Sequence, residues 1–167
     1  MMRIESSEQF AALQAEARAR DESQTRKVLV CCGTGCLATG AKEVAEAFAR
    51  EIEERRLDIE VGLGVKSTGC HGFCERGPLV AFLPEGLLYT KVKAKRVPEI
   101  IDKTVIGREL IPGLLYKNPV DNERIPAYEE IPFYKNQVRV AMRNIGRIDP
   151  TDLMDAIAHD AYAGLAK

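Results

Sequence analysis

Apolar and polar positions change their period several times along the chain, and this pattern predicts a mixed α/β protein. Between residues 6 and 20, Phe10, Leu13 and Ala17 fall on one helical face. The charged stretch 20–27 breaks this period and is typical of a linker. We therefore expect an N-terminal helix that is largely solvated and packs on the domain that follows.

The next segment predicts a strand, a helix and a second strand. Residues 28–30 form a short apolar run, residues 41–56 place apolar side chains at helical spacing, and residues 59–65 alternate apolar with small side chains. If the two strands are parallel, a right-handed crossover brings their C-terminal ends to one edge of the sheet. Open α/β sheets usually bind ligands at such an edge.

A hairpin and another helix complete this region. Residues 79–83 and 87–90 are apolar runs that flank Pro84-Glu-Gly86, which is a hairpin signal. Residues 96–106 then return to helical spacing. The resulting order of elements is the thioredoxin-like plan, and we assign it to residues 26–107.

The segment 108–132 contains recurrent prolines and keeps no helical or strand period for long, so we interpret it as a connector. It also contains Leu114, Leu115, Tyr116 and Tyr128, which are unusual in a free linker. We therefore expect the connector to be ordered against another part of the protein.

Two further helices are expected after the connector. The first spans residues 133–145, and its apolar face consists of Val138, Ala141, Met142 and Ile145. A basic stripe on the same helix consists of Lys135, Arg139 and Arg143. This stripe suits a solvated face and a partner-facing face equally well. Asp149 followed by Pro150 predicts the start of the last helix. The predicted parts of the chain are thus 1–25, 26–107, 108–132 and 133–167.

Composition narrows the class of function. The 167 residues are 46% hydrophobic and 29% charged, and the formal net charge is −1. These values argue against a membrane protein with a transmembrane segment, and they give no indication of nucleic-acid binding. The first residues lack the apolar core and cleavage site of an export signal, so we expect a cytoplasmic protein.

All five cysteines gather in two glycine-rich loops that follow the two predicted strands. Cys31 and Cys36 have the spacing C-x4-C, with Cys32 between them, and Cys70 and Cys74 have the spacing C-x3-C. An odd, clustered set without an export signal indicates metal binding rather than disulfides. Glycines let backbone N–H groups approach sulfur atoms, which suits a [2Fe–2S] cluster held by two thiolate pairs.

Other uses of the thiols are open at this point. Structural zinc also takes four thiolates, although its usual pairs are C-x2-C, and a redox dithiol needs a C-x-x-C pair that the chain lacks. Spacing alone does not exclude Cys32 as a ligand, because it gives C-x3-C with Cys36, and Cys32 could also serve as a free redox-sensing thiol. A Rieske-type site needs two histidines. The second histidine of the chain, His159, is distant, so we interpret His71 as a loop residue near the metal.

The two loops resemble a known family. Val28–Cys36 and Thr68–Pro78 are similar to the thioredoxin-like [2Fe–2S] ferredoxins, which include the small ferredoxin-like subunit of respiratory complex I. Together with Tyr89–Val92, they resemble the N-terminal ferredoxin domain of NADH-binding flavoprotein subunits in soluble and electron-bifurcating [FeFe]-hydrogenases. Related subunits occur in formate dehydrogenases. Ile131–Gln137 and Met142–Pro150 resemble the start of the flavoprotein domain itself.

The resemblance implies that Cys31, Cys36, Cys70 and Cys74 hold one [2Fe–2S] cluster and that the thiol of Cys32 points elsewhere. It implies an electron-transfer module of an NADH-dependent multi-subunit oxidoreductase, of the NADH dehydrogenase or hydrogenase type. Its partners would be the other redox subunits, a homodimer is compatible with this role, and nucleic acid is not an expected partner.

The chain also departs from the flavoprotein pattern. No cysteine follows Cys74, and no G-x-G-x-x-G motif occurs. FMN and NADH are therefore expected only in a region beyond Lys167 or in partner subunits, and we do not expect the chain to be catalytic alone. The alternative function is a structural or zinc-stabilised assembly domain without an electron-transfer role.

Overall fold

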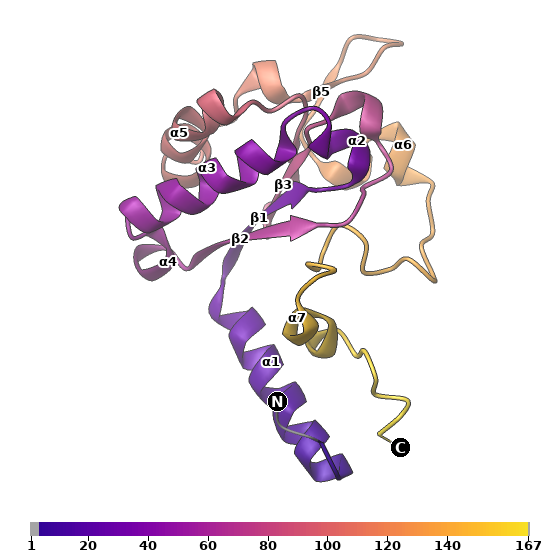
Figure 1. Cartoon of the computed structure of the whole chain (residues 1–167). Helices are drawn as coiled ribbons and strands as arrows, with labels where there is room; N and C mark the ends of the chain where they lie inside the picture. Colours follow the sequence, from indigo (N-terminus) through magenta and orange to yellow (C-terminus); the bar gives the residue numbers. More distant parts are fainter. Residues whose placement is uncertain (1–3, 167) are drawn as a thin grey trace.

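A four-stranded sheet with strand order β2-β1-β3-β4 organises the fold (Figure 1). The strands are β1 (Arg26–Cys31), β2 (Leu63–Thr68), β3 (Val80–Leu83) and β4 (Leu87–Tyr89). β1 pairs with β2 in parallel and with β3 in antiparallel, and β3 pairs with β4 in antiparallel. The predicted parallel pair and the predicted hairpin are both confirmed.

The computed structural model describes residues 4–166, together with all side chains in this range except those of residues 59 and 60. Residues 1–3 and 167, which the first and last predicted segments include, lie outside the described part. None of the described helices is both long enough and apolar enough to cross a membrane.

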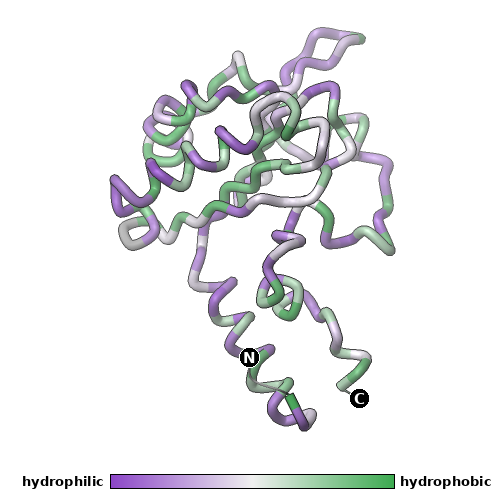
Figure 2. Tube along the Cα trace, in the orientation of Figure 1, coloured by the Kyte–Doolittle hydropathy of each residue, from purple (hydrophilic) through white to green (hydrophobic). Residues whose placement is uncertain are grey.

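Helix α3 (Ala41–Glu54) covers one face of the sheet (Figure 1). The predicted apolar positions Val44, Phe48 and Ile52 are buried, and the Phe48 ring packs edge-on against the ring of Phe82, with centroids 6.3 Å apart. Figure 2 shows that hydrophobic residues gather on the strands and on the sheet side of α3. This layer forms the main core because it removes the longest apolar stripes from water.

The helix predicted over residues 96–106 is present as several consecutive turns. They are η2 (Ala94–Arg96), α5 (Val97–Ile100) and the π-helical segment η3 (Ile101–Ile106). Val97, Ile100, Ile101 and Val105 are buried against α3 and the sheet edge.

The prediction of a strand over residues 59–65 is wrong in its position. Residues Leu57–Glu60 form a helical turn, α4, and the strand begins only at Leu63. Leu57, the first residue of α4, is 3% exposed and belongs to the main core, so this turn packs on the core and is not part of the sheet. Gly62, at φ +60°, then turns the chain into β2.

The connector is ordered, as expected. Leu114, Leu115 and Tyr116 are buried, and isolated bridges join Tyr89 to Leu115 and Leu87 to Ala127. Its short elements are η4 (Pro112–Leu114), β5 (Tyr116–Lys117), β6 (Arg124–Ile125) and η5 (Tyr128–Glu130). The connector therefore extends the open edge of β4 instead of leaving it as a free linker.

The helix predicted over residues 133–145 is largely absent. Helix α6 covers only Pro132–Lys135, and the chain beyond it consists of loop and turns. Val138 is 89% exposed and Met142 is 57% exposed, so the predicted apolar face has no core to pack against. Of the predicted basic stripe, Lys135 ends α6, whereas Arg139 and Arg143 lie in the loop and turns beyond it, so the three do not share a helix face.

The last helix also begins later than predicted. Helix α7 spans Leu153–Ala158, and its N-cap is Asp152, whose carboxylate accepts hydrogen bonds from the backbone N–H groups of Met154 and Asp155. Asp149 instead accepts hydrogen bonds from Thr151 within the preceding turn. Asp149 and Asp152 are both of a residue type that suits an N-cap. Asp152 is the one used, and the helix that it caps buries Ile157.

Helix α1 (Ser7–Ser23) is capped by Ser6, whose side chain accepts a hydrogen bond from the Gln9 backbone N–H, and it projects away from the sheet beside α7 (Figure 1). The two helices share a separate hydrophobic cluster with Phe10, Ala17 and Ile157 at its centre. Figure 2 shows that the rest of α1 is mainly hydrophilic. The predicted packing face is confirmed, but its partner is α7 and not the sheet.

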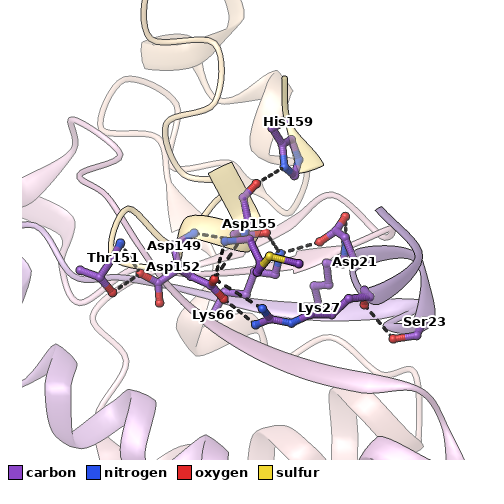
Figure 3. Close-up of polar contacts among 11 residues, drawn as sticks. Asp21, Ser23, Lys27, Lys66, Asp149, Thr151, Asp152, Asp155 and His159 are labelled. Atoms are coloured by element: carbon purple, nitrogen blue, oxygen red, sulfur yellow. Dashed lines mark hydrogen bonds and ion pairs between the residues drawn. The ribbon is translucent and has the colours of Figure 1, made fainter. Parts of the chain in front are cut away.

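An ion network fixes this helical pair to the sheet (Figure 3). Lys66 of β2 donates to Asp21 of α1 and to Asp155 of α7, and Lys27 of β1 pairs with Asp21 at 2.6 Å. The side chains of Lys66 and Asp155 are 12% and 5% exposed. Breaking one partner of such a buried network leaves an uncompensated charge, so the network ties α1, α7 and the sheet together.

Candidate metal centre

The two cysteine loops begin side by side at one end of the sheet. Cys31 is the last residue of β1, Thr68 is the last residue of β2, and the two are paired in the parallel register. The first loop (residues 31–36) and the second loop (residues 69–76) therefore leave neighbouring strands in the same direction. This is the arrangement that the crossover rule predicts.

The first loop buries its pair of thiols. Cys31 is 1% exposed, and Cys36, in the helical turn α2 (Thr34–Leu37), is fully buried. A hydrogen bond with Cys36, supported by the backbone N–H groups of His71 and Gly33, lowers the pKa of Cys31 to about 6. The same bond and burial raise the pKa of Cys36. The pair thus readily gives up its first proton and holds its second.

The second loop is more open. The Sγ atoms of Cys70 and Cys74 lie 3.7 Å apart, and Cys74 is exposed at the start of η1 (Cys74–Arg76). The backbone N–H of Gly72 donates to the Cys70 Sγ at 3.3 Å. This N–H alone would lower the pKa of Cys70, but burial and the hydrogen bond shared with Cys74 outweigh it and raise the pKa.

Glycines bring the two loops into direct contact. A Cβ atom on Gly33 would lie 2.7 Å from the Cβ of Cys70, and one on Gly77 would lie 2.6 Å from the Sγ of Cys36. Neither distance occurs between real side chains, so only glycine permits this approach. The four predicted thiols are thereby gathered at one place from loops that are 34 or more residues apart in the chain.

Cys32 lies beside this group. Its backbone N–H donates to the carbonyl oxygen of Thr68 at 2.8 Å, which joins the first loop to the end of β2. Burial raises the pKa of its thiol, and a hydrogen bond with Ser67 offsets this only in part. The side chain therefore favours the neutral thiol, whereas Cys31 favours the thiolate that a metal requires.

His71 is buried, and protein groups occupy both of its ring nitrogens. Its Nε2 lies 3.0 Å from the Thr68 hydroxyl and its Nδ1 lies 3.1 Å from the Tyr128 hydroxyl. Burial, with a smaller effect from Arg139, lowers the pKa of His71 to about 4. The ring is therefore a neutral bridge that supports the second loop, and His159 is hydrogen-bonded to the Asp155 carbonyl oxygen in α7 instead of meeting it.

A known protein family matches the part of the chain that contains both cysteine loops. The family model for the thioredoxin-like [2Fe–2S] ferredoxins matches residues 18–105, which is just over half of the chain. This chain belongs to that family. Its ferredoxin domain accordingly carries the [2Fe–2S] cluster chemistry and the electron-transfer role of the thioredoxin-like ferredoxins.

Curated relatives and solved structures agree with the family. A 2Fe-2S ferredoxin of Clostridium pasteurianum is 37% identical over 79 residues, which cover 47% of this chain and 76% of the relative. A 2Fe-2S ferredoxin of Aquifex aeolicus is 32% identical over 80 residues, which cover 48% of this chain and 71% of the relative. The solved structure of the wild-type thioredoxin-like [2Fe–2S] ferredoxin from Aquifex aeolicus matches with a TM-score of 0.52 and 28% identity, covering 57% of this chain and 99% of that one.

Outside the part that matches the ferredoxin family, residues 128–146 enclose the second loop. We call five of these residues the clasp: Tyr128, Phe133, Tyr134, Arg139 and Gly146. The Phe133 ring stacks on the Phe73 ring with centroids 4.7 Å apart, and the Arg139 guanidinium donates to the His71 carbonyl oxygen at 3.2 Å. A Cβ on Gly146 would lie 2.8 Å from the His71 ring.

The clasp has no counterpart among the elements that the sequence predicts. Its signal was weak: Tyr128 was recognised as unsuited to a linker, but Phe133 and Arg139 were assigned to a helix that the structure does not contain. The aromatic residues 128, 133 and 134 fall in a proline-rich stretch without periodicity.

The donor set fits a [2Fe–2S] cluster. Such a cluster needs four thiolates in two pairs, loops with little side-chain bulk and N–H groups near sulfur, and the two loops provide all three. Among the described side chains, which exclude those of residues 59 and 60, no three His, Cys, Asp or Glu groups converge on the position of one ion. The thiols are instead distributed as two pairs, one in each loop.

Proposed function

We propose that the chain is the electron-transfer module of an NADH-dependent multi-subunit oxidoreductase, with Cys31, Cys36, Cys70 and Cys74 as the ligands of its [2Fe–2S] cluster. The observation that carries the ligand assignment is the contact of the two loops through Gly33 and Gly77, which unites a thiol pair from each. A bound cluster would supply one-electron transfer through its iron atoms, which these four sulfurs would hold.

The chain's own residues would hold and shield such a cluster. The N–H of Gly72 donates to the Cys70 Sγ, and hydrogen bonds of this kind raise the reduction potential of iron–sulfur centres. Buried Phe73 keeps water from one side of the second loop, while exposed Cys74 leaves the other side open. An electron would therefore enter or leave most directly on the Cys74 side.

The wider context is part of the same proposal. The loop motifs resemble those of flavoprotein subunits that oxidise NADH, so FMN and NADH would bind outside residues 1–167 or in partner subunits. In this proposal the chain divides into 1–25, 26–107, 108–132 and 133–167, and the last part would belong to a flavoprotein-like domain, which is supported by the resemblance of residues 131–137 and 142–150. The compartment would be the cytoplasm, where these partners operate.

Cluster content tests the ligand assignment. Purified without oxygen, the chain should contain about two irons and two sulfides and should give an EPR signal after reduction. Serine substitution at Cys31, Cys36, Cys70 or Cys74 should lower the iron content strongly, whereas Cys32→Ser should keep it. A colourless protein with one zinc per chain would instead support the zinc-stabilised assembly domain.

Reduction by NADH tests the context separately. The chain alone should be bleached only slowly by NADH, and a tagged chain purified with its native partners should be bleached rapidly. If NADH does not reduce an intact cluster in the native assembly, the NADH-dependent context is excluded. The electron-transfer role of the cluster is not affected by that result.

A further inference from the structure

A cavity of about 730 Å³ lies on the sheet face opposite α3. Leu29 of β1 and Ala81 of β3 form part of its floor, and residues 134–147 form part of the facing wall. Leu29 and Ala81 are cross-strand neighbours, so they present one continuous apolar surface. The cavity is thus enclosed between the ferredoxin sheet and the segment that follows it.

Positive charge dominates the walls of this cavity. Lys135, Arg143 and Arg147 line it, and none of them forms an ion pair with a carboxylate among residues 4–166. Arg139 also lines it, with its guanidinium over the Tyr134 ring at 5.4 Å. Among the described lining residues, Glu129 is the one carboxylate. Lys135, Arg143 and Arg147 are exposed, so solvent screens their repulsion, but an anion that entered between them would meet several positive charges at once.

Two tyrosines that stack on each other also line the cavity. The rings of Tyr128 and Tyr134 are stacked at 4.2 Å with an interplanar angle of 17°, and both line the space. Small-molecule sites have volumes of about 300–1,000 Å³, apolar walls and a few convergent polar groups. Inorganic phosphate would leave most of this cavity empty, and a folded protein surface would not enter it.

We propose that this cavity binds a phosphorylated small molecule of nucleotide size. Its phosphates would be held by Arg143 and Arg147, because guanidinium groups bind phosphate oxygens in a bidentate manner. Its planar organic part would lie on the apolar floor beside the tyrosine pair. The cavity borders the second cysteine loop through His71 and shares Tyr128, Tyr134, Arg139 and Gly146 with the clasp, but none of the cysteines is among its described lining residues. The proposal does not rest on the proposed role of the cluster.

Titration calorimetry on the cluster-loaded full chain tests the site, with ATP, pyrophosphate and adenosine as the probes. ATP should bind with one site per chain, and pyrophosphate and adenosine should each bind at least about tenfold more weakly, because each lacks half of the interactions. Added salt should weaken ATP binding, since charge pairs are screened.

Paired variants locate the binding. Arg143→Ala combined with Arg147→Ala should weaken ATP binding by at least about tenfold, because charge-assisted hydrogen bonds are lost. Arg50→Ala combined with Lys95→Ala removes two exposed positive charges elsewhere and should change the affinity by less than about twofold. Arg143→Lys combined with Arg147→Lys keeps both positive charges and should keep part of the affinity for ATP.

Three results would overturn the proposal. The first is the absence of ATP binding with a dissociation constant below about 1 mM. The second is an equal loss of affinity in the two paired variants, which would indicate attraction by net charge alone. The third is binding of pyrophosphate as tight as that of ATP, or binding of an acidic peptide in place of ATP, which would assign the cavity to another class of ligand.

Discussion

The first and second cysteine loops carry equivalent thiol pairs but depend on different parts of the protein. The first loop is closed by its own helical turn α2 and by the sheet, with Cys31 and Cys36 almost without exposure. The second loop has an exposed Cys74, and its interior residues His71 and Phe73 contact the clasp. One loop is therefore a property of the ferredoxin domain, and the other is supported by residues outside the family match.

The two loops are therefore expected to differ in how firmly they hold a metal. A buried loop that closes itself offers a fixed pair of ligands. A loop that rests on a neighbouring segment can change its stability, and hence its hold on metal, when that segment moves. We therefore expect changes in the clasp to act on the second loop while the first loop stays intact.

The largest effect is expected where the two loops touch. Gly33→Ala places a Cβ 2.7 Å from the Cβ of Cys70 and 3.0 Å from its Cα, so the backbone of the second loop must move. We expect a loss of about 1–3 kcal/mol in the free energy of unfolding and a strong loss of iron. Chemical denaturation and iron analysis measure the two effects.

Gly113→Ala is the control for this change, because a Cβ at Gly113 meets nothing within 4 Å. It should leave both iron content and stability unchanged. Full iron content in Gly33→Ala would show that the two loops are not in contact through this glycine.

The next effect concerns the aromatic stack. Phe133→Ala removes the ring that stacks on Phe73 of the second loop, while Phe133 itself is 39% exposed. We expect a cost of about 0.5–1.5 kcal/mol and faster loss of iron to a chelator. Val138→Ala, at an 89% exposed position of the same segment, should change neither. Equal chelation rates in the two variants would contradict a role of the clasp.

A smaller effect is expected from one hydroxyl group. Tyr128→Phe removes the hydroxyl that bonds the Nδ1 of His71 at 3.1 Å and leaves the ring stack with Tyr134 in place. The expected cost is about 0.5–1.5 kcal/mol, at the lower end if water enters. The NMR signals of the His71 ring should shift, and those of His159 should not. Unchanged His71 signals would show that the contact does not form in solution.

These two regions also differ in how far the sequence predicted them. The first loop followed from short-range signals: an apolar run, glycines and the spacing of Cys31 and Cys36. The sheet edge followed from the crossover rule, which is why the second thiol pair was placed correctly beside the first. Local patterns suffice where a segment is held by its immediate neighbours in the chain.

The clasp could not be predicted in the same way. Its contacts join Tyr128 to His71 and Arg139 to the His71 carbonyl oxygen over 57 and 68 residues, and no local period encodes such contacts. The apolar spacing of residues 133–145 fits a helix, but Val138 and Met142 are left exposed, so this spacing does not bury an apolar face. Tertiary contacts thus decided a segment whose local pattern favoured another structure.

The smallest effect concerns the far end of the C-terminal segment, where α7 is attached to α1. Arg20 donates to Asp152, and this hydrogen bond lowers the pKa of that carboxyl below 3.8. Because the folded pKa is lowered, this contribution to stability is present above pH 3.8 and is lost as the pH falls through the folded pKa.

Asp152→Asn keeps an N-cap for α7 and removes the charge, so it isolates the ion pair. It should cost about 0.2–1 kcal/mol at pH 7, since the pair is largely exposed, and nothing once Asp152 is protonated. Urea unfolding at pH 7 and at a pH low enough to protonate Asp152 measures this cost. Asp58→Asn, at an exposed position, is the control. If the cost is the same in acid, the charge of Asp152 does not hold α7 on α1. In that case the apolar cluster that α1 and α7 share around Ile157, and not the ion pair, holds α7 against α1.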